Sequence, residues 1–255
     1  VFPYLDDWLI ASSLFSKALS EVEEVCLLLR DFGFLLNHRK SHLLPQHTLQ
    51  FLGALFCMVE GEVFLSEERR LTLVNHLTLL LGQSQAPVRQ WLRSQGEMAS
   101  VLAIVPWSRV HLYPLVHHLL SHWDPLSRDY EVMVPVTPQI TSALQWWLLP
   151  LSLHRGFQLD RPSPVTISTD ASLVGWGAVL ASFQAQGRWS VEESLHSSNW
   201  RELAAVQRAL WVFLPHLAHL PVCVQTDNQV VRAYLNRQGG MVPSLYLLSR
   251  DICLW

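Results

Sequence analysis

Three carboxylate residues in the last third of the chain occur where a metal site would need them. Asp170 ends a predicted strand, Glu202 lies in the first turn of a predicted helix, and Asp227 ends another predicted strand. If the two strands are neighbours, their ends meet at one edge of a sheet and the helix supplies Glu202 from above. Such a cluster repels itself without a cation, and it suits two Mg²⁺ ions about 3.5–4 Å apart that activate water for phosphodiester cleavage, with Mn²⁺ as a substitute.

Each acid also has a simpler explanation. Asp170 and Asp227 are suited to Asx turns at strand ends. Asn199 followed three residues later by Glu202 resembles a capping box, and a Glu in the first turn complements the helix dipole. Taken singly, these explanations are the more common ones. The order of the elements, with an acid at each appropriate place, favours a metal site.

The elements that position these acids follow a Pro-rich stretch, Asp160-Arg-Pro-Ser-Pro164, which we take as a linker. Short apolar runs predict strands over 165–169, 175–181, 188–191 and 221–226. Helical periodicity predicts helices over 199–217, over 229–237 and from 243 onward, with a break at Gly239-Gly240.

The part before the linker shows mostly helical periodicity. Strand, turn and strand are expected over 1–10, and a hairpin pair over 50–56 and 62–65. Helices are expected over 16–31, 66–82, 87–103, 108–122 and 138–149.

The composition describes a folding chain with no membrane span. Of 255 residues, 50% are hydrophobic and 15% charged, which is enough to bury one large core or two modest ones. No apolar run approaches the roughly 18 residues of a transmembrane helix.

Four widely spaced cysteines argue against a disulfide framework and fit an intracellular setting, nuclear or cytoplasmic. The net charge of -3 does not by itself indicate a nucleic-acid binder, although 16 of the 18 basic residues are arginine, which suits phosphate contacts.

The sequence around the three acids resembles the ribonuclease H domain of retroelement reverse transcriptases. The likeness rests on Ser168-Thr-Asp-Ala-Ser-Leu-Val-Gly-Trp-Gly-Ala178, Trp200-Arg-Glu-Leu-Ala-Ala-Val206 and Thr226-Asp-Asn-Gln-Val-Val231. Ala233-Tyr-Leu-Asn-Arg-Gln-Gly-Gly240 resembles DIRS-type, tyrosine-recombinase retrotransposons in particular. The resemblance implies that Asp170, Glu202 and Asp227 are the first three metal ligands of a site that cuts RNA in RNA–DNA hybrids. It also implies a fourth, late acid on a segment beyond Trp255.

The start of the chain is similar to another part of the same proteins. Tyr4-Leu-Asp-Asp7 resembles the Y-x-D-D signature of reverse transcriptase palms, which implies that Asp6 and Asp7 are catalytic and that Asp6 binds metal. The alternative is an ordinary acidic β-turn. Gly33-Phe-Leu-Leu-Asn37 with Lys40, and Gln50-Phe-Leu-Gly53, resemble the palm motifs that follow, the second being the primer-grip hairpin. The resemblance makes Lys40 a candidate contact to nucleic acid and the candidate general acid for pyrophosphate departure, and the alternative is a solvated basic residue.

The helical stretch 66–122 resembles the thumb and the start of a connection region. Arg89, Arg93 and Arg109 are candidates to grip template or primer phosphates, although arginines on helix surfaces are commonly just solvated.

Other clusters are expected to be structural. His118 and His122 lie four residues apart but lack a third metal ligand, so we expect surface or hydrogen-bonded histidines. The core is expected to include the tryptophans Trp146, Trp147, Trp200 and Trp211.

The sequence therefore predicts a multidomain chain of the α+β or α/β class. A partial reverse transcriptase palm (1–65) and a thumb and connection (66–163) precede an RNase H-like mixed-sheet domain (164–255) that lacks its C-terminal end. The expected partners are RNA–DNA hybrid and template-primer, and we expect DNA synthesis only with further fingers and palm segments upstream. The alternatives are an inactive retroelement relic that only binds nucleic acid, and a recombinase or resolvase nuclease of the same fold, against which the Tyr4-Leu-Asp-Asp7 block counts.

Overall fold

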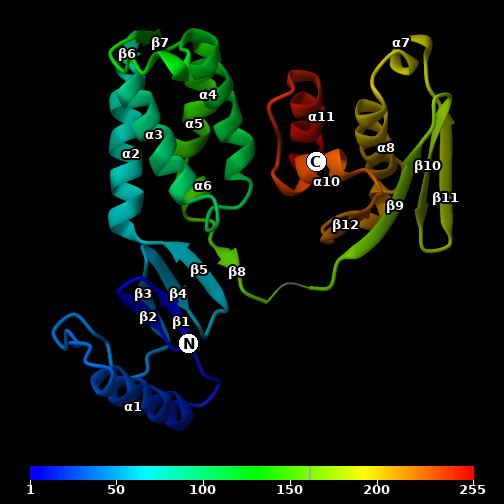
Figure 1. Ribbon diagram of the computed structural model, residues 1–255. Coiled ribbons are helices and arrows are strands. Elements are labelled where there is room, and N and C mark those ends of the chain that lie inside the picture. The colour runs from blue at the N-terminus through cyan, green and yellow to red at the C-terminus, as the bar shows by residue number, and fades with distance from the viewer. Residues whose placement is uncertain (161) are drawn as a thin grey trace.

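The computed structural model describes residues 1–160 and 162–255, which form three successive parts along the chain (Figure 1). The first part opens with the hairpin of β1 (Phe2–Tyr4) and β2 (Asp7–Leu9), in which Tyr4 pairs with Asp7 across a turn at Leu5 and Asp6. This is the expected strand, turn and strand. Helix α1 (Phe15–Asp31) follows and buries only Ala18.

An antiparallel sheet connects the first part to the helices. Its strand order is β3-β4-β5-β8, formed by β3 (Thr48–Phe51), β4 (Ala54–Cys57), β5 (Glu62–Leu65) and β8 (Phe157–Gln158). The single strand expected over 50–56 is wrong, because Leu52 and Gly53 adopt positive φ values of 50° and 78° and divide it into β3 and β4. Strand β8 was not expected, and it returns the chain to this sheet after the helices.

The middle part consists mainly of helices. They are α2 (Glu67–Leu81), α3 (Val88–Ser100), α4 (Ser108–His122), α5 (Pro138–Leu148) and α6 (Pro150–Leu153), with a short 3₁₀ turn, η1 (Pro125–Ser127). Helices α2, α3, α4 and α5 lie where periodicity predicts helices, whereas α6 and η1 were not expected. Apolar stripes from these helices meet in one core, where Trp91, Leu115 and Trp147 are fully buried. An unexpected ladder of β6 (Gln85–Pro87) with β7 (Met133–Pro135) closes the end of the bundle.

The last part is a mixed sheet with helices. The strand order is β11-β10-β9-β12, formed by β9 (Val165–Ala171), β10 (Gly175–Leu180), β11 (Phe183–Arg188) and β12 (Val222–Gln225). Strands β9, β10 and β11 are an antiparallel meander, and β12 pairs parallel with β9. The helices are α7 (Val191–Ser194), α8 (Ser198–Val212), α9 (Leu214–Leu217), α10 (Gln229–Asn236) and α11 (Pro243–Cys253).

Two sequence expectations for this part need correction. The third strand is β11, which ends at Arg188, because Ala181 at positive φ makes the preceding turn tight and brings Phe183 opposite Leu180. The helix expected over 199–217 divides at Phe213, since Pro215 sits in the first turn of α9 and cannot continue the hydrogen bonding of α8.

Helix α8 covers one face of the sheet and forms the second core. Ile167 of β9 and Ala205 of α8 have no exposed surface. Among the tryptophans expected in cores, Trp147 is fully buried and Trp146 and Trp200 are half-buried, whereas Trp211 is 58% exposed because it lies on the face of α8 turned from the sheet. That expectation was wrong for Trp211.

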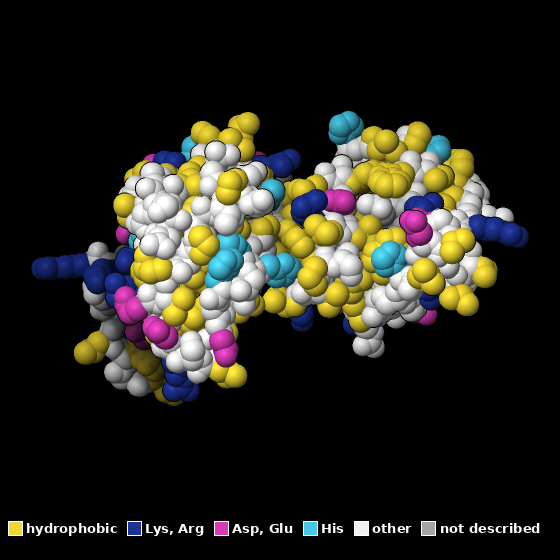
Figure 2. All heavy atoms as spheres, turned by 90° about the horizontal axis from the view of Figure 1, so that it is seen from above, with side chains coloured by type: hydrophobic (Ala, Val, Ile, Leu, Met, Phe, Trp, Pro, Cys, Tyr) yellow, Lys and Arg dark blue, Asp and Glu magenta, His cyan; other side chains and the backbone are white. Residues whose placement is uncertain are grey.

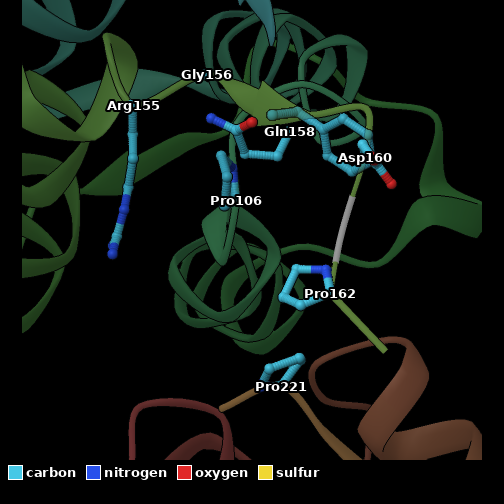
Figure 3. Close-up of a pocket in the computed structure, with 8 residues that line it drawn as sticks. Pro106, Arg155, Gly156, Gln158, Asp160, Pro162 and Pro221 are labelled. Carbon is cyan, nitrogen blue, oxygen red and sulfur yellow. The ribbon is translucent and has the colours of Figure 1, made fainter. Parts of the chain in front are cut away.

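A shallow groove of about 460 Å³ lies where the chain crosses from the middle part to the last part (Figure 3). Pro106, Pro162 and Pro221 line it together with Asp160. None of the three acids of the last part reaches it. Within the described residues, no helix has the length and apolar character needed to cross a membrane.

Candidate metal centre

The three acids of the last part converge at one edge of the mixed sheet. Asp170 lies near the end of β9, Asp227 follows the end of β12, and Glu202 comes from α8. Because β9 and β12 run parallel, their carboxyl ends reach the same edge, and α8 crosses above it. Ligand oxygens of the three carboxylates all lie within 4.8 Å of one another. The topology thus assembles acids that are up to 57 positions apart in sequence.

The local structure removes two of the simpler explanations for these acids. Asp170 lies inside β9, paired with Gly177, and not in a turn. Helix α8 is capped by Ser197, whose hydroxyl accepts from the Trp200 N–H, so Asn199 and Glu202 do not form the capping box that was the alternative to a metal ligand. Glu202 stands one full turn past the cap. Its carboxylate is therefore available to the cluster.

Asp227 is likewise separate from the cap of the helix that follows it. The side chain of Asn228 caps α10 and accepts from the N–H groups of Val230 and Val231. Asp170 and Asp227 are exposed, and Glu202 is buried. The site therefore has an open side formed by two aspartates and an inner ligand on α8.

The position of Glu202, buried beside two other carboxylates, disfavours the charged form of its side chain. Its side chain is 6% exposed, and its Oε2 has no hydrogen-bond partner within the described part of the chain. Burial, and after it the charges of Asp170 and Asp227, raise the pKa of Glu202 to about 7, against the lowering effect of a backbone hydrogen bond from Ala171. A buried, unpartnered carboxylate oxygen beside two other carboxylates fits a hard divalent cation, which prefers such oxygen ligands.

One pair of supporting residues was missed by the sequence reasoning. The side-chain amide of Asn228 donates to the Asn199 side chain at 3.0 Å, which joins the start of α10 to the start of α8 beside the acids. The sequence does signal Asn228, because an Asn directly before a helical run is a typical N-cap. The partner could not be predicted, since it depends on where α8 crosses the sheet.

The other predicted acids do not form a comparable cluster. Asp6 and Asp7 lie at the exposed tip of the first hairpin, as the turn motif predicts. Within the described residues, no third His, Cys, Asp or Glu joins them in a metal-binding group. Lys40 is exposed and stands in a turn, where its N–H donates to the Asn37 side chain.

The predicted basic contacts lie on the helical part and are not gathered. Arg89 and Arg93 are exposed on α3, where Arg89 forms an ion pair with Glu131 at 2.6 Å, and Arg109 is half-buried on α4. Figure 2 shows Lys and Arg side chains scattered over this face of the molecule, without a continuous basic stripe.

His118 and His122 of α4 are hydrogen-bonded, as expected. His118 Nε2 lies 2.7 Å from the Pro135 carbonyl, and His122 bonds within its own helix. Across the described ranges, the only group of three or more metal-type ligands is Asp170, Glu202 and Asp227.

Comparisons with known proteins place the chain beside viral polyproteins. No family model matches it. The genome polyproteins of two isolates of Petunia vein clearing virus, Shepherd and Hohn, are each 23% identical over 257 residues. The match covers 96% of this chain and 11% of either polyprotein, so the chain spans a small part of these relatives.

A solved structure shows the same fold. The foamy viral protease-reverse transcriptase in complex with an RNA/DNA hybrid matches 95% of this chain and 32% of its own chain, with 16% sequence identity and a TM-score of 0.50. The expected α+β organisation, similar to part of a reverse transcriptase, is thereby confirmed at the level of fold. The division into palm, thumb and connection, and the DIRS-type origin, stay predictions.

Proposed function

We propose that this chain is part of a retroelement reverse transcriptase whose last unit is an RNase H-like endoribonuclease. Asp170, Glu202 and Asp227 bind two divalent cations, Mg²⁺ or Mn²⁺, and the substrate is the RNA strand of an RNA–DNA hybrid. The observation that carries the proposal is the convergence of the three carboxylates within 4.8 Å, from two parallel strand ends and a crossing helix.

The chemistry follows from the residues themselves. The cations, when bound, supply an activated water and neutralise charge at the leaving oxygen. The exposed Asp170 and Asp227 hold the open side, where a phosphodiester can approach. The buried Glu202 fixes the inner side and must lose its proton to act as a ligand.

The whole parent protein adds a second activity to the proposal. Asp6 and Asp7 serve RNA-directed DNA synthesis, together with fingers and palm segments outside this sequence, and Lys40, Arg89, Arg93 and Arg109 contact template-primer. The similarity to a protease-reverse transcriptase supports this assignment through fold. The finer assignment to a DIRS-type element rests on the segment Ala233 to Gly240 with Ser244 and Leu245 after it.

Cleavage of a labelled RNA–DNA hybrid tests the proposal. Mg²⁺-dependent cutting of the RNA strand is expected, with duplex DNA and duplex RNA left intact. Asp170→Asn and Asp227→Asn should each reduce the rate by at least about 100-fold, the scale of removing one charge-stabilising group. Asp251→Asn is the matched control, because Asp251 lies on α11 outside the cluster and should retain the rate.

The alternative outcomes separate the competing functions. Cutting of duplex DNA in preference to the hybrid would favour a recombinase or resolvase nuclease. A folded chain that is extended beyond Trp255, binds hybrid and cuts nothing would be the inactive relic. Cleavage that persists in both aspartate variants would exclude the triad as the site.

A further inference from the structure

Helix α4 of the middle part contacts the last part at the turn that follows α10. The Nε2 atom of His117 lies 3.1 Å from the Gly240 carbonyl. The Tyr246 hydroxyl on α11 donates to the Val110 carbonyl on α4 at 3.1 Å, and this bond is buried. Burial raises the pKa of Tyr246 to about 12, which keeps its hydroxyl a donor. The two parts are thus joined by directed bonds as well as by the linker.

Aromatic rings pack closely around the same turn. The Tyr246 ring lies 5.1 Å from the His117 ring, edge on, and 5.7 Å from the Tyr113 ring. Gly239 is buried between them at a φ of 142°, and a Cβ added to it would lie 2.6 Å from the Tyr113 ring. Only glycine fits this position, because both the backbone conformation and the ring exclude a side chain.

Helix α10 connects this contact directly to the acids. Its last turn is held at the contact, where the Gly239 N–H donates to the Tyr234 carbonyl at 2.8 Å. Its first turn is capped by Asn228, which also bonds to Asn199 at 3.0 Å. Asp227 directly precedes that cap. The eight residues of α10 therefore form a rigid spacer between α4 and the Asp227 ligand.

We propose that α4 is a positioning support for the metal site. Docking of the turn at Gly239 and Gly240 on Tyr113 and His117 fixes α10, and α10 holds Asp227 at its distance from Glu202. The inference rests on the metal site proposed above and adds that this site depends on a helix outside the RNase H-like unit. His117, Tyr113 and Gly239 are positioning residues, since they do not touch the acids.

Two measurements on the full chain test this dependence. Mn²⁺ titration gives the cation affinity, and hydrogen exchange gives the protection of the α10 amides at Val230 and Val231. His117→Ala should weaken Mn²⁺ binding by about 10-fold, the lower range for groups that orient metal ligands, and should speed exchange in α10. His117→Gln keeps an N–H donor for the Gly240 carbonyl and should restore both values. His122→Ala is the matched control on α4, because His122 bonds within its own helix.

Two glycine variants, one at the contact and one outside it, provide a second test of Mn²⁺ affinity with a larger expected effect. Gly239→Ala introduces the clash with Tyr113 and should lower Mn²⁺ affinity at least as far as His117→Ala. Gly33→Ala shares the cost of a positive φ, at 81°, but its added Cβ meets open space, and it should leave the affinity unchanged.

The results distinguish failure of this inference from failure of the metal site. Unchanged α10 exchange, or unchanged Mn²⁺ affinity beside a wild type that binds, would overturn the support role. A wild type that binds no Mn²⁺ would overturn the proposed metal site, and with it the support role, even if the exchange arm showed that α4 orders α10.

Discussion

The two acidic motifs of this chain differ in how the fold treats them. Asp6 and Asp7 are adjacent in sequence and lie exposed at a hairpin tip, where a short turn is enough to place them. Asp170, Glu202 and Asp227 are far apart in sequence, and a sheet edge and a crossing helix bring their oxygens within 4.8 Å. The first is a local motif, and the second is an assembled site. In the assembled site Glu202 is buried, and its pKa is raised.

Cation affinity should show the largest difference between the two motifs. Asp170→Asn and Asp227→Asn each remove a charged ligand from the assembled site and should weaken Mn²⁺ binding by at least about 10-fold. Asp6→Asn and Asp7→Asn should leave the tight binding unchanged in this chain. The measurement is a Mn²⁺ titration at neutral pH. Equal losses from both sets of variants would remove the distinction between the motifs.

The stability of the metal-free protein should depend on pH through Glu202. Its pKa of about 7 in the folded chain exceeds the usual 4.5, so the folded state binds this proton more tightly than the unfolded state. The bound proton of Glu202 makes its full contribution to the free energy of unfolding below about pH 4.5, and this contribution is lost as pH rises through about 7. The loss amounts to up to about 3 kcal/mol, at roughly 1.4 kcal/mol per pH unit. Glu202→Gln should abolish this loss in urea unfolding followed between pH 5 and pH 8.

An exposed glutamate provides the control for that experiment. Glu192→Gln changes the same chemical group on α7 without the burial, so the pH dependence of wild type should persist. If Glu202→Gln kept the wild-type slope of unfolding free energy against pH, that slope would come from other groups and not from Glu202.

The start of α8 gives a smaller but sharply located effect. Ser197→Ala removes the cap of the helix that carries Glu202 and should lower the free energy of unfolding by about 1 kcal/mol. Ser198→Ala changes the next, exposed residue and should alter it by less than about 0.5 kcal/mol. Urea midpoints measure both. A larger loss at Ser198 would mean that the helix begins elsewhere.

Much of the assembled site could be predicted from sequence because its parts are local signals. Acids at strand ends and a helix periodicity around Glu202 were enough to expect that they meet. The cap at Ser197 was not found, because Ser197, Ser198 and Asn199 all suit an N-cap and the sequence does not show which of them accepts from a backbone N–H of α8. The bond from Asn228 to Asn199 joins residues 29 positions apart, so it depends on how α8 and α10 lie in the folded chain.

The fold was predicted less well where tertiary pairing overrides local preference. Strand β8 has two residues and exists because it pairs with β5, which no short window can show. The strand expected over 50–56 contains Leu52 at positive φ, a conformation that its sequence does not signal. The contact of α4 with Gly239 and Gly240 joins residues more than 120 positions apart, so it too required the structure.

The smallest effect is expected for the two exposed arginines of α3, in the salt dependence of hybrid binding. Arg93 is exposed, whereas the charge of Arg89 is balanced by Glu131 at 2.6 Å. If α3 contacts the backbone of a hybrid, Arg93→Ala should reduce the slope of log affinity against log salt by about 0.9, the release of one counterion. Arg89→Ala should reduce it by less, because its guanidinium must first leave the carboxylate. Both variants should retain wild-type stability within about 1 kcal/mol, since exposed ion pairs contribute little. Equal slopes for wild type and both variants would show that α3 does not face the phosphates.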